Sequence, residues 1–434
     1  MAQEYTQFPP QWRQHGTILY QRYGDPKPSD RLAMFDMDNT LMLTPSTIIG
    51  ELVKGNKPWI NKPAVANDLI LYNPNVREML LEEISNGRSI VVCSNQSQLF
   101  DRPEVSRLIF DRIQILLEKL DVPLYIMLAF KRDLCRKPTC GMLEFYETHL
   151  NDSIKVNRAD SFYVGDAAGR RWPKEVLDAN SERILALLKA EDFSDRCYMN
   201  KIGSKYRRVD ANAIIANTAA SSINSKFEVD FSDCDYKFAL NNGLQFYTPE
   251  GYFAKLPRIE LTLDFDPKLI GKSPIDIDIR DGLVILVGPP SCGKTFLCEK
   301  HLQDFIRISD SAYKSAEACL DEASKCLQRK DKVVIDSCNA LESDREPYIS
   351  LARNHGVKCT VIYLDVSSDF AIHFHRYRKI MKLSPQRLPS LDSIYRYYKR
   401  LEPPKESEGF DRMIHITDDT FPVEHNEVSK LHLP

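Results

Sequence analysis

The sequence predicts two α/β domains, each built on a mainly parallel sheet with helices on its faces. Short apolar runs alternate with polar loops and helical patterns, which is typical of parallel sheets. The 434 residues also exceed the roughly 250 to 300 over which a single hydrophobic core keeps growing. The runs expected as strands are residues 32–35, 90–93, 161–164, 283–287, 333–335 and 361–364.

Two segments have the apolar spacing of helices, and one segment between the expected strands has neither pattern. Residues 105–119 and 296–305 are expected to be helical. Residues 171–227 have little strand signal and contain Ala and Ser runs beside a basic stretch. We expect them to form an inserted helical excursion or a mobile loop.

A proline-containing stretch, residues 256–281, separates the two groups of expected strands and resembles a connector with some strand character. We therefore place the domain boundary near Arg258. The expected division is an N-terminal extension (1–30), a first domain (31–257), a linker (258–280) and a second domain (281–434).

Composition argues against a disordered, membrane-spanning or secreted chain. Hydrophobic residues make up 43% and charged residues 27%, as in ordinary globular proteins. No apolar run approaches the roughly 18 residues of a membrane helix, and the first residues lack a signal-sequence pattern. The 11 scattered cysteines favour free thiols in a reducing intracellular compartment over disulfides or zinc. With a net charge of -3, a nucleic-acid partner would need a local basic patch.

Two carboxylates, Asp36 and Asp38, follow the first expected strand in the sequence Asp-Met-Asp. A carboxylate at a strand end can attack phosphorus to form an acyl phosphate. A neighbour two residues on can protonate the leaving oxygen and then activate water. We therefore expect Asp36 to be a nucleophile and Asp38 a general acid and base. Capping of the next element is the alternative for these side chains.

Three more strand ends or loops carry side chains that suit phosphate chemistry. Asp166 is expected to complete a Mg²⁺ site with Asp36 and Asp38, because oxygen ligands suit this ion. Ser94 is expected to donate to a phosphoryl oxygen. Lys137 is expected to neutralise the charge that remains on the phosphoryl group.

The order Asp-x-Asp, Ser, Lys and Gly-Asp resembles the haloacid dehalogenase superfamily of phosphohydrolases. Longer strings narrow this resemblance to the phosphatase domain of the polynucleotide kinase 3'-phosphatases. The resemblance implies a Rossmann-like domain that hydrolyses 3'-phosphate ends. The strings are CSNQ (93–96), RKPTCGM (136–142), VGDAAGR (164–170), and DFS (230–232) through DYKFALN (235–241).

A phosphate-binding loop follows the strand expected at residues 283–287. The string GPPSCGKT fits G-x-x-x-x-G-K-[ST] between a strand and a helical pattern. Lys294 is expected to reach the outer phosphates of ATP, and the Thr295 hydroxyl to bind Mg²⁺. A chance Gly-Lys turn is the alternative. The residues expected to hold the nucleotide are Gly288, Ser291, Cys292, Gly293, Lys294 and Thr295.

Two acids lie beyond the next apolar runs. We expect Asp310 to accept the proton of an attacking hydroxyl, and Asp336 to hold Mg²⁺. Ser311 and Asp336 are the alternatives for the proton acceptor.

A basic stretch with interleaved aromatic residues, HFHRYRK at 373–379, follows the last expected strand. We expect an arginine lid over the nucleotide, with Arg376 and Arg378 on the transferring group. A solvated helix face is the alternative. Further cations follow at Lys382, Arg387, Arg396, Lys399 and Arg400.

The second half resembles the kinase domain of the same family, which implies phosphorylation of 5'-hydroxyl ends. The resemblance covers about residues 12–410. It is carried by the P-loop, residues 333–339, Asp344-Arg345, Arg376-Tyr377-Arg378, and the strings at 401–404 and 408–410.

The sequence departs from the family in three places. Residues 1–30 are too short for the forkhead-associated domain that the animal enzymes carry. Ser309 stands before Asp310, where the family has Arg. Residues 171–227 are longer than the family usually shows.

Two opposite phosphate chemistries on one chain suit a broken nucleic-acid strand, since ligation needs a 3'-hydroxyl and a 5'-phosphate. We therefore expect a monomeric DNA-repair enzyme that uses Mg²⁺ and ATP. It would act on single- or double-stranded DNA ends, without a membrane partner, in the nucleus, with mitochondria as a second compartment. The alternatives are RNA ends, a phosphatase with a degenerate ATP-binding domain, a metabolite kinase-phosphatase, and a scaffold for repair proteins.

Overall fold

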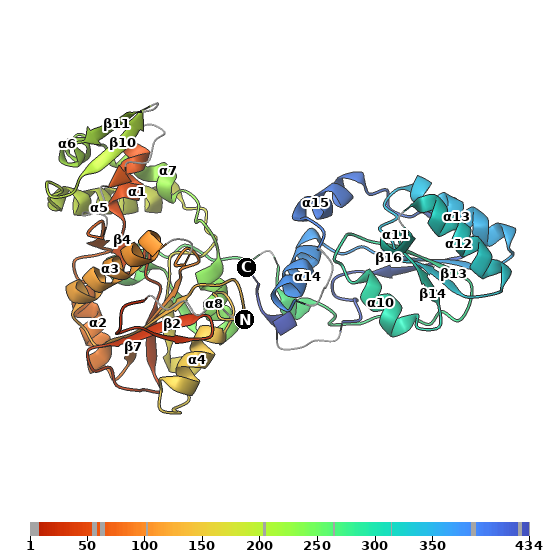
Figure 1. The fold of residues 1–434 in the computed structure, drawn as a ribbon, viewed down its shortest axis with the longest axis horizontal. Coiled ribbons are helices and arrows are strands. Elements are labelled where there is room, and N and C mark those ends of the chain that lie inside the picture. The colour runs from red at the N-terminus through yellow and green to blue at the C-terminus, as the bar shows by residue number, and fades with distance from the viewer. Residues whose placement is uncertain are drawn as a thin grey trace. The chain divides into compact units, whose positions relative to one another are not determined.

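The computed structural model (Figure 1) describes residues 8–53, 59–60, 66–100, 103–202, 205–263, 265–313, 315–382, 388–423 and 428–433. The chain divides into two units. Unit 1 ends at Thr262, and unit 2 spans Leu263–Leu433. This division falls inside the segment expected as a linker, whose exact bounds stay a prediction.

A seven-stranded sheet forms the centre of unit 1. Its neighbours are parallel from β8 to β12, whereas β1 and β2 run antiparallel at one edge. The expected mainly parallel α/β sheet is confirmed. In spatial order the strands are β1 (Arg13–His15), β2 (Ile18–Tyr23), β8 (Leu124–Ala129), β7 (Ser89–Asn95), β3 (Leu32–Phe35), β9 (Phe162–Val164) and β12 (Gln245–Tyr247).

The N-terminal segment differs from the expected extension. Strand β2 pairs along its length with β8, from Ile18 opposite Ala129 to Tyr23 opposite Leu124. Two strands of the described part of residues 1–30, β1 and β2, therefore belong to the sheet of unit 1. They were not expected, because β1 and the end of β2 are exposed and polar.

Helices cover both faces of this sheet. Because side chains alternate along a strand, Ala33 and Phe35 enter one core, and Leu32 and Met34 enter the other. Helices α2 (Val76–Ser85), α3 (Pro103–Leu120) and α9 (Pro249–Ala254) pack on the first core, and α4 (Gly141–His149) and α8 (Cys234–Asn242) on the second. The helix expected at residues 105–119 is α3.

A smaller lobe of unit 1 carries a three-stranded antiparallel sheet in the order β11-β10-β5 (Figure 1). Its apolar residues, such as Phe193 and Tyr198, belong to the same core as Phe35. Strands β4 (Met42–Leu43) and β6 (Ile70–Leu71) pair in a separate short antiparallel ribbon. The lobe contains α1 (Pro45–Leu52), β5 (Trp59–Ile60), α5 (Lys174–Ala190), β10 (Tyr198–Ile202), β11 (Lys205–Val209), α6 (Ala211–Ala216), η2 (Ala220–Ile223) and α7 (Asn224–Phe227).

The lobe corrects the prediction for residues 171–227. A helical excursion is present in α5, α6 and α7, but two strands, β10 and β11, were not expected. The mobile-loop alternative is wrong for the described residues, since they form regular elements around a shared core. All five residues of β11 are exposed or half-buried, so the sequence lacked the apolar alternation that indicates a strand.

Unit 2 is built on a fully parallel five-stranded sheet, as expected. Helices α10 and α14 border one core and α12 and α13 the other. In spatial order the strands are β14 (Ile306–Ile308), β15 (Val333–Ile335), β13 (Leu283–Val287), β16 (Cys359–Leu364) and β17 (Arg412–Ile416). The helices are α10 (Lys294–His301), α11 (Asp310–Tyr313), α12 (Ala316–Gln328), α13 (Glu342–Asn354), α14 (Ser368–Ile380) and α15 (Leu391–Arg400).

Two details of the expected secondary structure are wrong. The helix expected at residues 296–305 begins earlier and ends at His301, because Phe305 packs into the core just before β14. The connector expected to have strand character contains only the 3-10 helix η3 (Pro267–Leu269) among its described residues. Within the described part of the chain, no helix has the length and apolar character needed to cross a membrane.

Candidate active sites

Asp36 stands at the carboxyl end of β3, in the middle of the unit 1 sheet. Its N–H donates to the carbonyl of Val164 at 2.8 Å, which continues the pairing of β3 with β9. Asp36 is 7% exposed. The central sheet therefore holds the expected nucleophile in an almost fully buried position.

Lys137 lies against this carboxylate, as the sequence predicted. Its Nζ is 2.6 Å from Oδ1 of Asp36, and the side chain is buried. The Asn95 side-chain amide at the end of β7 bonds both the N–H and the carbonyl of Lys137, each at 3.1 Å. Two segments distant in sequence thus fix the position of the ammonium group.

A third carboxylate, Asp235 in α8, completes the cluster. Its Oδ1 accepts hydrogen bonds from Lys137 Nζ at 2.8 Å and from the Tyr163 hydroxyl at 3.1 Å. Its Oδ2 accepts from the N–H of Ala167 at 3.1 Å. A Cβ at Gly165 would lie 2.6 Å from Asp235, so only glycine fits there.

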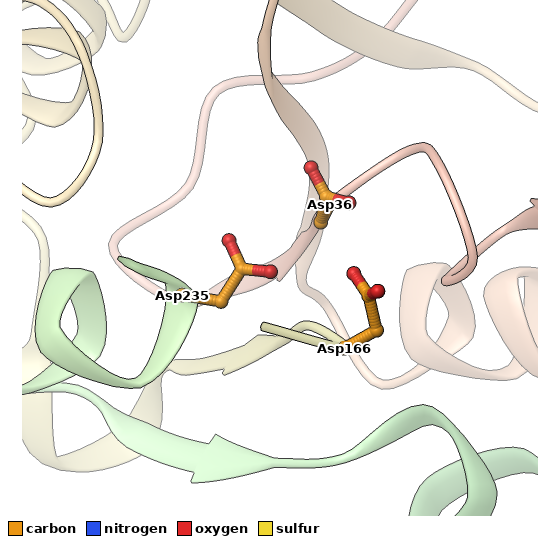
Figure 2. Close-up of side chains that lie close together, drawn as sticks. All are labelled: Asp36, Asp166 and Asp235. Carbon is orange, nitrogen blue, oxygen red and sulfur yellow. The ribbon is translucent and has the colours of Figure 1, made fainter. Parts of the chain in front are cut away.

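Asp36, Asp166 and Asp235 point toward one another (Figure 2), with a ligand oxygen from each within 4.8 Å of the others. Burial raises the pKa of Asp36 to about 7, where Asp235 adds to the effect and Lys137 opposes it. Burial, together with the carboxylates of Asp36 and Asp235, raises the pKa of Asp166 well above its usual range. Three oxygen ligands that repel one another this strongly fit a divalent cation such as Mg²⁺.

Asp38 lies apart from this cluster. Its Oδ2 accepts a 2.9 Å bond from the Gln96 amide, which also donates to Ser94 at 3.0 Å. Ser94 is buried at the end of β7. The structure thus joins Asp38 and Ser94 through Gln96, and brings Asp235 rather than the Asp38 carboxylate to the expected metal ligands. The roles given to Asp38 and Ser94 stay predictions.

The second site starts at the P-loop of unit 2, between β13 and α10. Gly293 has φ +96°, and a Cβ there would lie 2.6 Å from the Phe421 ring. Lys294 is 9% exposed, and its Nζ donates to the carbonyls of Gly288 at 2.9 Å and Pro289 at 2.7 Å. The loop is therefore closed around the lysine that was expected to reach the phosphates.

Asp336, at the end of β15, faces the first turn of α10. The hydroxyl of Thr295 donates to its Oδ2 at 2.8 Å, and Arg307 Nε lies 3.4 Å from the same oxygen. Paired hydroxyl and carboxylate oxygens at a P-loop are the arrangement that holds Mg²⁺ in nucleotide-binding proteins. Asp336 and Thr295 are thus brought together as predicted.

Asp310 is exposed at the end of β14 and lines a cavity of about 520 Å³. Pro290 of the P-loop lines the same cavity. Ser311 does not line it; its hydroxyl lies 3.0 Å from that of Ser309. Of the two acids, Asp310 faces open space beside the P-loop, whereas Asp336 is bound to Thr295.

The arginines of this cavity are not the ones that the sequence singled out. Arg396 and Arg400 of α15 line it, whereas Arg376 and Arg378 lie half-buried on α14 and do not belong to the described lining. Arg387 lies outside the described residues. The lid role of Arg376 and Arg378 stays a prediction.

Arg345 was quoted in the sequence only as part of a motif, and the structure gives it a position. It is fully buried and binds both carboxylate oxygens of Glu408, at 2.6 and 2.7 Å. It also donates to the carbonyls of Asn339 and Ala340, at 3.0 and 3.3 Å. Arg345 therefore holds the loop after Asp336, which lines the cavity.

Family models match both units. The model of the polynucleotide kinase 3 phosphatase family matches residues 31–253, a little over half of the chain. The chain belongs to the polynucleotide kinase 3 phosphatase family. An AAA domain model matches residues 283–390 in unit 2. The resemblance found in the sequence is thus confirmed, and the chain joins a phosphatase domain of this family to a P-loop domain.

Two relatives show how far the similarity extends. The bifunctional polynucleotide phosphatase/kinase of Schizosaccharomyces pombe is 25% identical over 410 residues, which cover 92% of this chain and 83% of the relative. The polynucleotide 3'-phosphatase ZDP of Arabidopsis thaliana is 25% identical over 260 residues, covering 56% of this chain and 27% of the relative.

Proposed function

We propose that this protein repairs the ends of broken nucleic-acid strands, by removing 3'-phosphates in unit 1 and adding 5'-phosphates in unit 2. The observation that carries the proposal is the 2.6 Å contact between Lys137 Nζ and Asp36 Oδ1 at the end of β3. Membership of the phosphatase family and similarity along nearly the whole bifunctional yeast relative support it.

In unit 1, a carboxylate oxygen of Asp36 attacks the phosphorus of the 3'-phosphate, and the bond from phosphorus to the 3'-oxygen breaks. Asp38 gives its proton to the leaving 3'-oxygen. It then takes a proton from water, which releases inorganic phosphate and restores Asp36. Lys137 and Ser94 bind the phosphoryl oxygens.

Mg²⁺ fits the carboxylates of Asp36 and Asp166, and when bound it offsets the charge between these acids and the phosphate. Both oxygens of Asp235 already accept hydrogen bonds from the protein. Of the three clustered carboxylates we therefore assign Asp235 to the ammonium group of Lys137 and the other two to the metal.

In unit 2, the loop from Gly288 to Thr295 would hold the phosphates of ATP, with Mg²⁺ at Thr295 and Asp336. The oxygen of the 5'-hydroxyl attacks the γ-phosphorus while Asp310 takes the hydroxyl proton, and ADP leaves. The cavity beside Asp310 supports a site for the strand end.

The test uses an oligonucleotide with a 5'-hydroxyl and a 3'-phosphate, incubated with Mg²⁺ and γ-labelled ATP. The wild type should produce a labelled 5'-phosphate and a 3'-hydroxyl. Asp36→Asn should lose only the 3' reaction, and Lys294→Ala only the 5' reaction. A wild type without the 5' reaction would support a degenerate kinase domain, and one active only on sugars or nucleosides would support a metabolite enzyme. The same assay with a DNA strand and with an RNA strand shows which of the two the protein prefers as a substrate.

A further inference from the structure

The lobe of unit 1 carries a strongly basic hairpin that contributes none of the residues assigned to the two active sites. We define the basic hairpin as β10 (Tyr198–Ile202) and β11 (Lys205–Val209), which pair antiparallel along their length. Residues 201–208 contain four cations and no acid, in a chain whose net charge is -3. Positive charge is therefore concentrated locally here.

Strand β11 presents its side chains to solvent on both faces. Lys205, Tyr206, Arg207 and Arg208 are all exposed, and β11 is the edge strand of its sheet. Among the described residues, no carboxylate forms an ion pair with any of the three cations. Their charge is thus available to an external anion.

Protection of a sheet edge is the simpler explanation for such charges, because edge strands often carry Lys or Arg that prevent pairing with other chains. That explanation does not account for Tyr206, which is 52% exposed and shares one face of β11 with Arg208, while Lys205 and Arg207 lie on the other face. An exposed aromatic ring would make an edge more prone to association. Cations interleaved with an exposed aromatic ring are the combination that binds single-stranded nucleic acid, through phosphate contacts and base stacking.

The hairpin is anchored to the phosphatase site. The chain that leaves β3 passes through Asp36 and Asp38 before it forms α1. The chain that leaves β9 passes through Asp166 before it forms α5. At the hairpin itself, the Tyr198 hydroxyl donates to buried Asp68 at 3.1 Å. The lobe and the main sheet also share one hydrophobic core. The hairpin is therefore part of the folded unit that carries Asp36.

We propose that the basic hairpin binds the single strand that leads to the 3'-phosphate, with Lys205, Arg207 and Arg208 on backbone phosphates and Tyr206 stacked on a base. This inference rests on the proposed 3'-phosphatase function and names the part of its substrate that lies away from the reacting phosphate. It predicts that strand length matters for binding and not for chemistry.

The test compares a 3'-phosphorylated dinucleotide with a 3'-phosphorylated strand of about 30 nucleotides, longer than the roughly 4 to 16 that one single-strand site covers. The main variant is the full chain with Lys205→Gln, Arg207→Gln and Arg208→Gln. The control carries Arg107→Gln, Lys119→Gln and Lys155→Gln, three exposed cations elsewhere in unit 1, so that both proteins lose the same charge.

For the long strand, the slope of log kcat/KM against log salt should fall by roughly 2 in the main variant, because each single-strand contact contributes about 0.7. The control should keep the wild-type slope. Tyr206→Ala should raise KM for the long strand about tenfold. Turnover of the dinucleotide should not change in any of these proteins.

Equal slopes in the main variant and its control would overturn the proposal, and so would an equal loss of activity on both substrates. If the triple variant unfolds, Arg207→Gln alone should lower the slope by about 0.7, and an unchanged slope would overturn the proposal. A loss seen with blunt duplex and not with single strand would also contradict it. If the wild type hydrolyses neither substrate, the phosphatase function fails separately, and fluorescence anisotropy with a 3'-hydroxyl strand still tests the hairpin.

Discussion

Asp235 binds the same ammonium group that contacts the expected nucleophile, because its Oδ1 accepts a 2.8 Å hydrogen bond from Lys137 Nζ. Burial acts to lower the pKa of Lys137, but the two carboxylates beside it outweigh burial and raise that pKa above its usual value. The ammonium group therefore stays charged beside the Asp36 carboxylate. This arrangement leads to the first prediction.

Asp235→Asn should lower the 3'-phosphatase kcat about a hundredfold, with little change in KM for the oligonucleotide, because Lys137 loses the charge that holds it. The free energy of unfolding of unit 1 should fall by about 3 kcal/mol, as when one partner of a buried ion pair is removed. The measurements are steady-state kinetics and denaturant unfolding. Asp233→Asn is the matched control, because Asp233 forms its ion pair with Lys237, at 2.8 Å, and does not contact Lys137 among the described residues. A kcat within threefold of the wild type would sink the assignment.

Asp38→Asn and Asp36→Asn should differ in what accumulates on the protein. With Asp38 replaced, the acyl phosphate on Asp36 should form slowly, because the leaving 3'-oxygen receives no proton. Once formed it should persist, because no general base activates the water that hydrolyses it. Acid quenching after mixing with a 3'-phosphorylated strand, followed by mass spectrometry, should detect one added phosphoryl group in Asp38→Asn and none in Asp36→Asn. If both variants carry the phosphoryl group, another residue is the nucleophile.

Asp310→Asn should lower the kinase rate at least about a hundredfold with little change in ATP affinity, because the amide keeps the size of the side chain and removes its basicity. Asp336→Asn should instead weaken the binding of Mg²⁺ with ATP, since Asp336 bonds Thr295. Single-turnover rates and nucleotide titrations separate the two effects. The base has been misassigned if Asp310→Asn keeps more than about a tenth of the rate while Asp336→Asn does not.

Arg396→Gln and Arg400→Gln should raise KM for a 5'-hydroxyl strand and leave KM for ATP nearly unchanged, because both side chains line the cavity beside Asp310. Arg376→Gln should weaken catalysis more than ATP binding, as expected of a residue that meets charge in the transition state. Kinetics with each substrate varied in turn measure these effects. An unchanged KM for the strand in both α15 variants would show that the cavity does not receive it.

The strand-end chemistry could be predicted because it is encoded locally. A buried apolar strand leads directly into Asp36, and another leads directly into the P-loop at Gly288. In each case the strand itself places the residues that follow it at the carboxyl edge of the sheet. The parallel order of the sheets followed from the same alternation.

Some contacts between distant segments, and one local pair of strands, could not be predicted. Asp235 meets Lys137 across many residues and no spacing links them, so it appeared only inside a quoted string. Arg396 and Arg400 reach the cavity only through the packing of α15. Strand β11 of the basic hairpin lacked apolar alternation, because an edge strand with both faces exposed needs none.

Gly165 carries no reactive atom, yet its missing side chain makes room for the carboxylate that a Cβ would meet at 2.6 Å. Two positions far apart in the sequence therefore cannot vary independently. Any side chain at 165 would require a smaller residue at 235, and that exchange would remove a partner of Lys137. Gly165, a residue that takes no part in the chemistry, is therefore as constrained in evolution as the carboxylate that it accommodates.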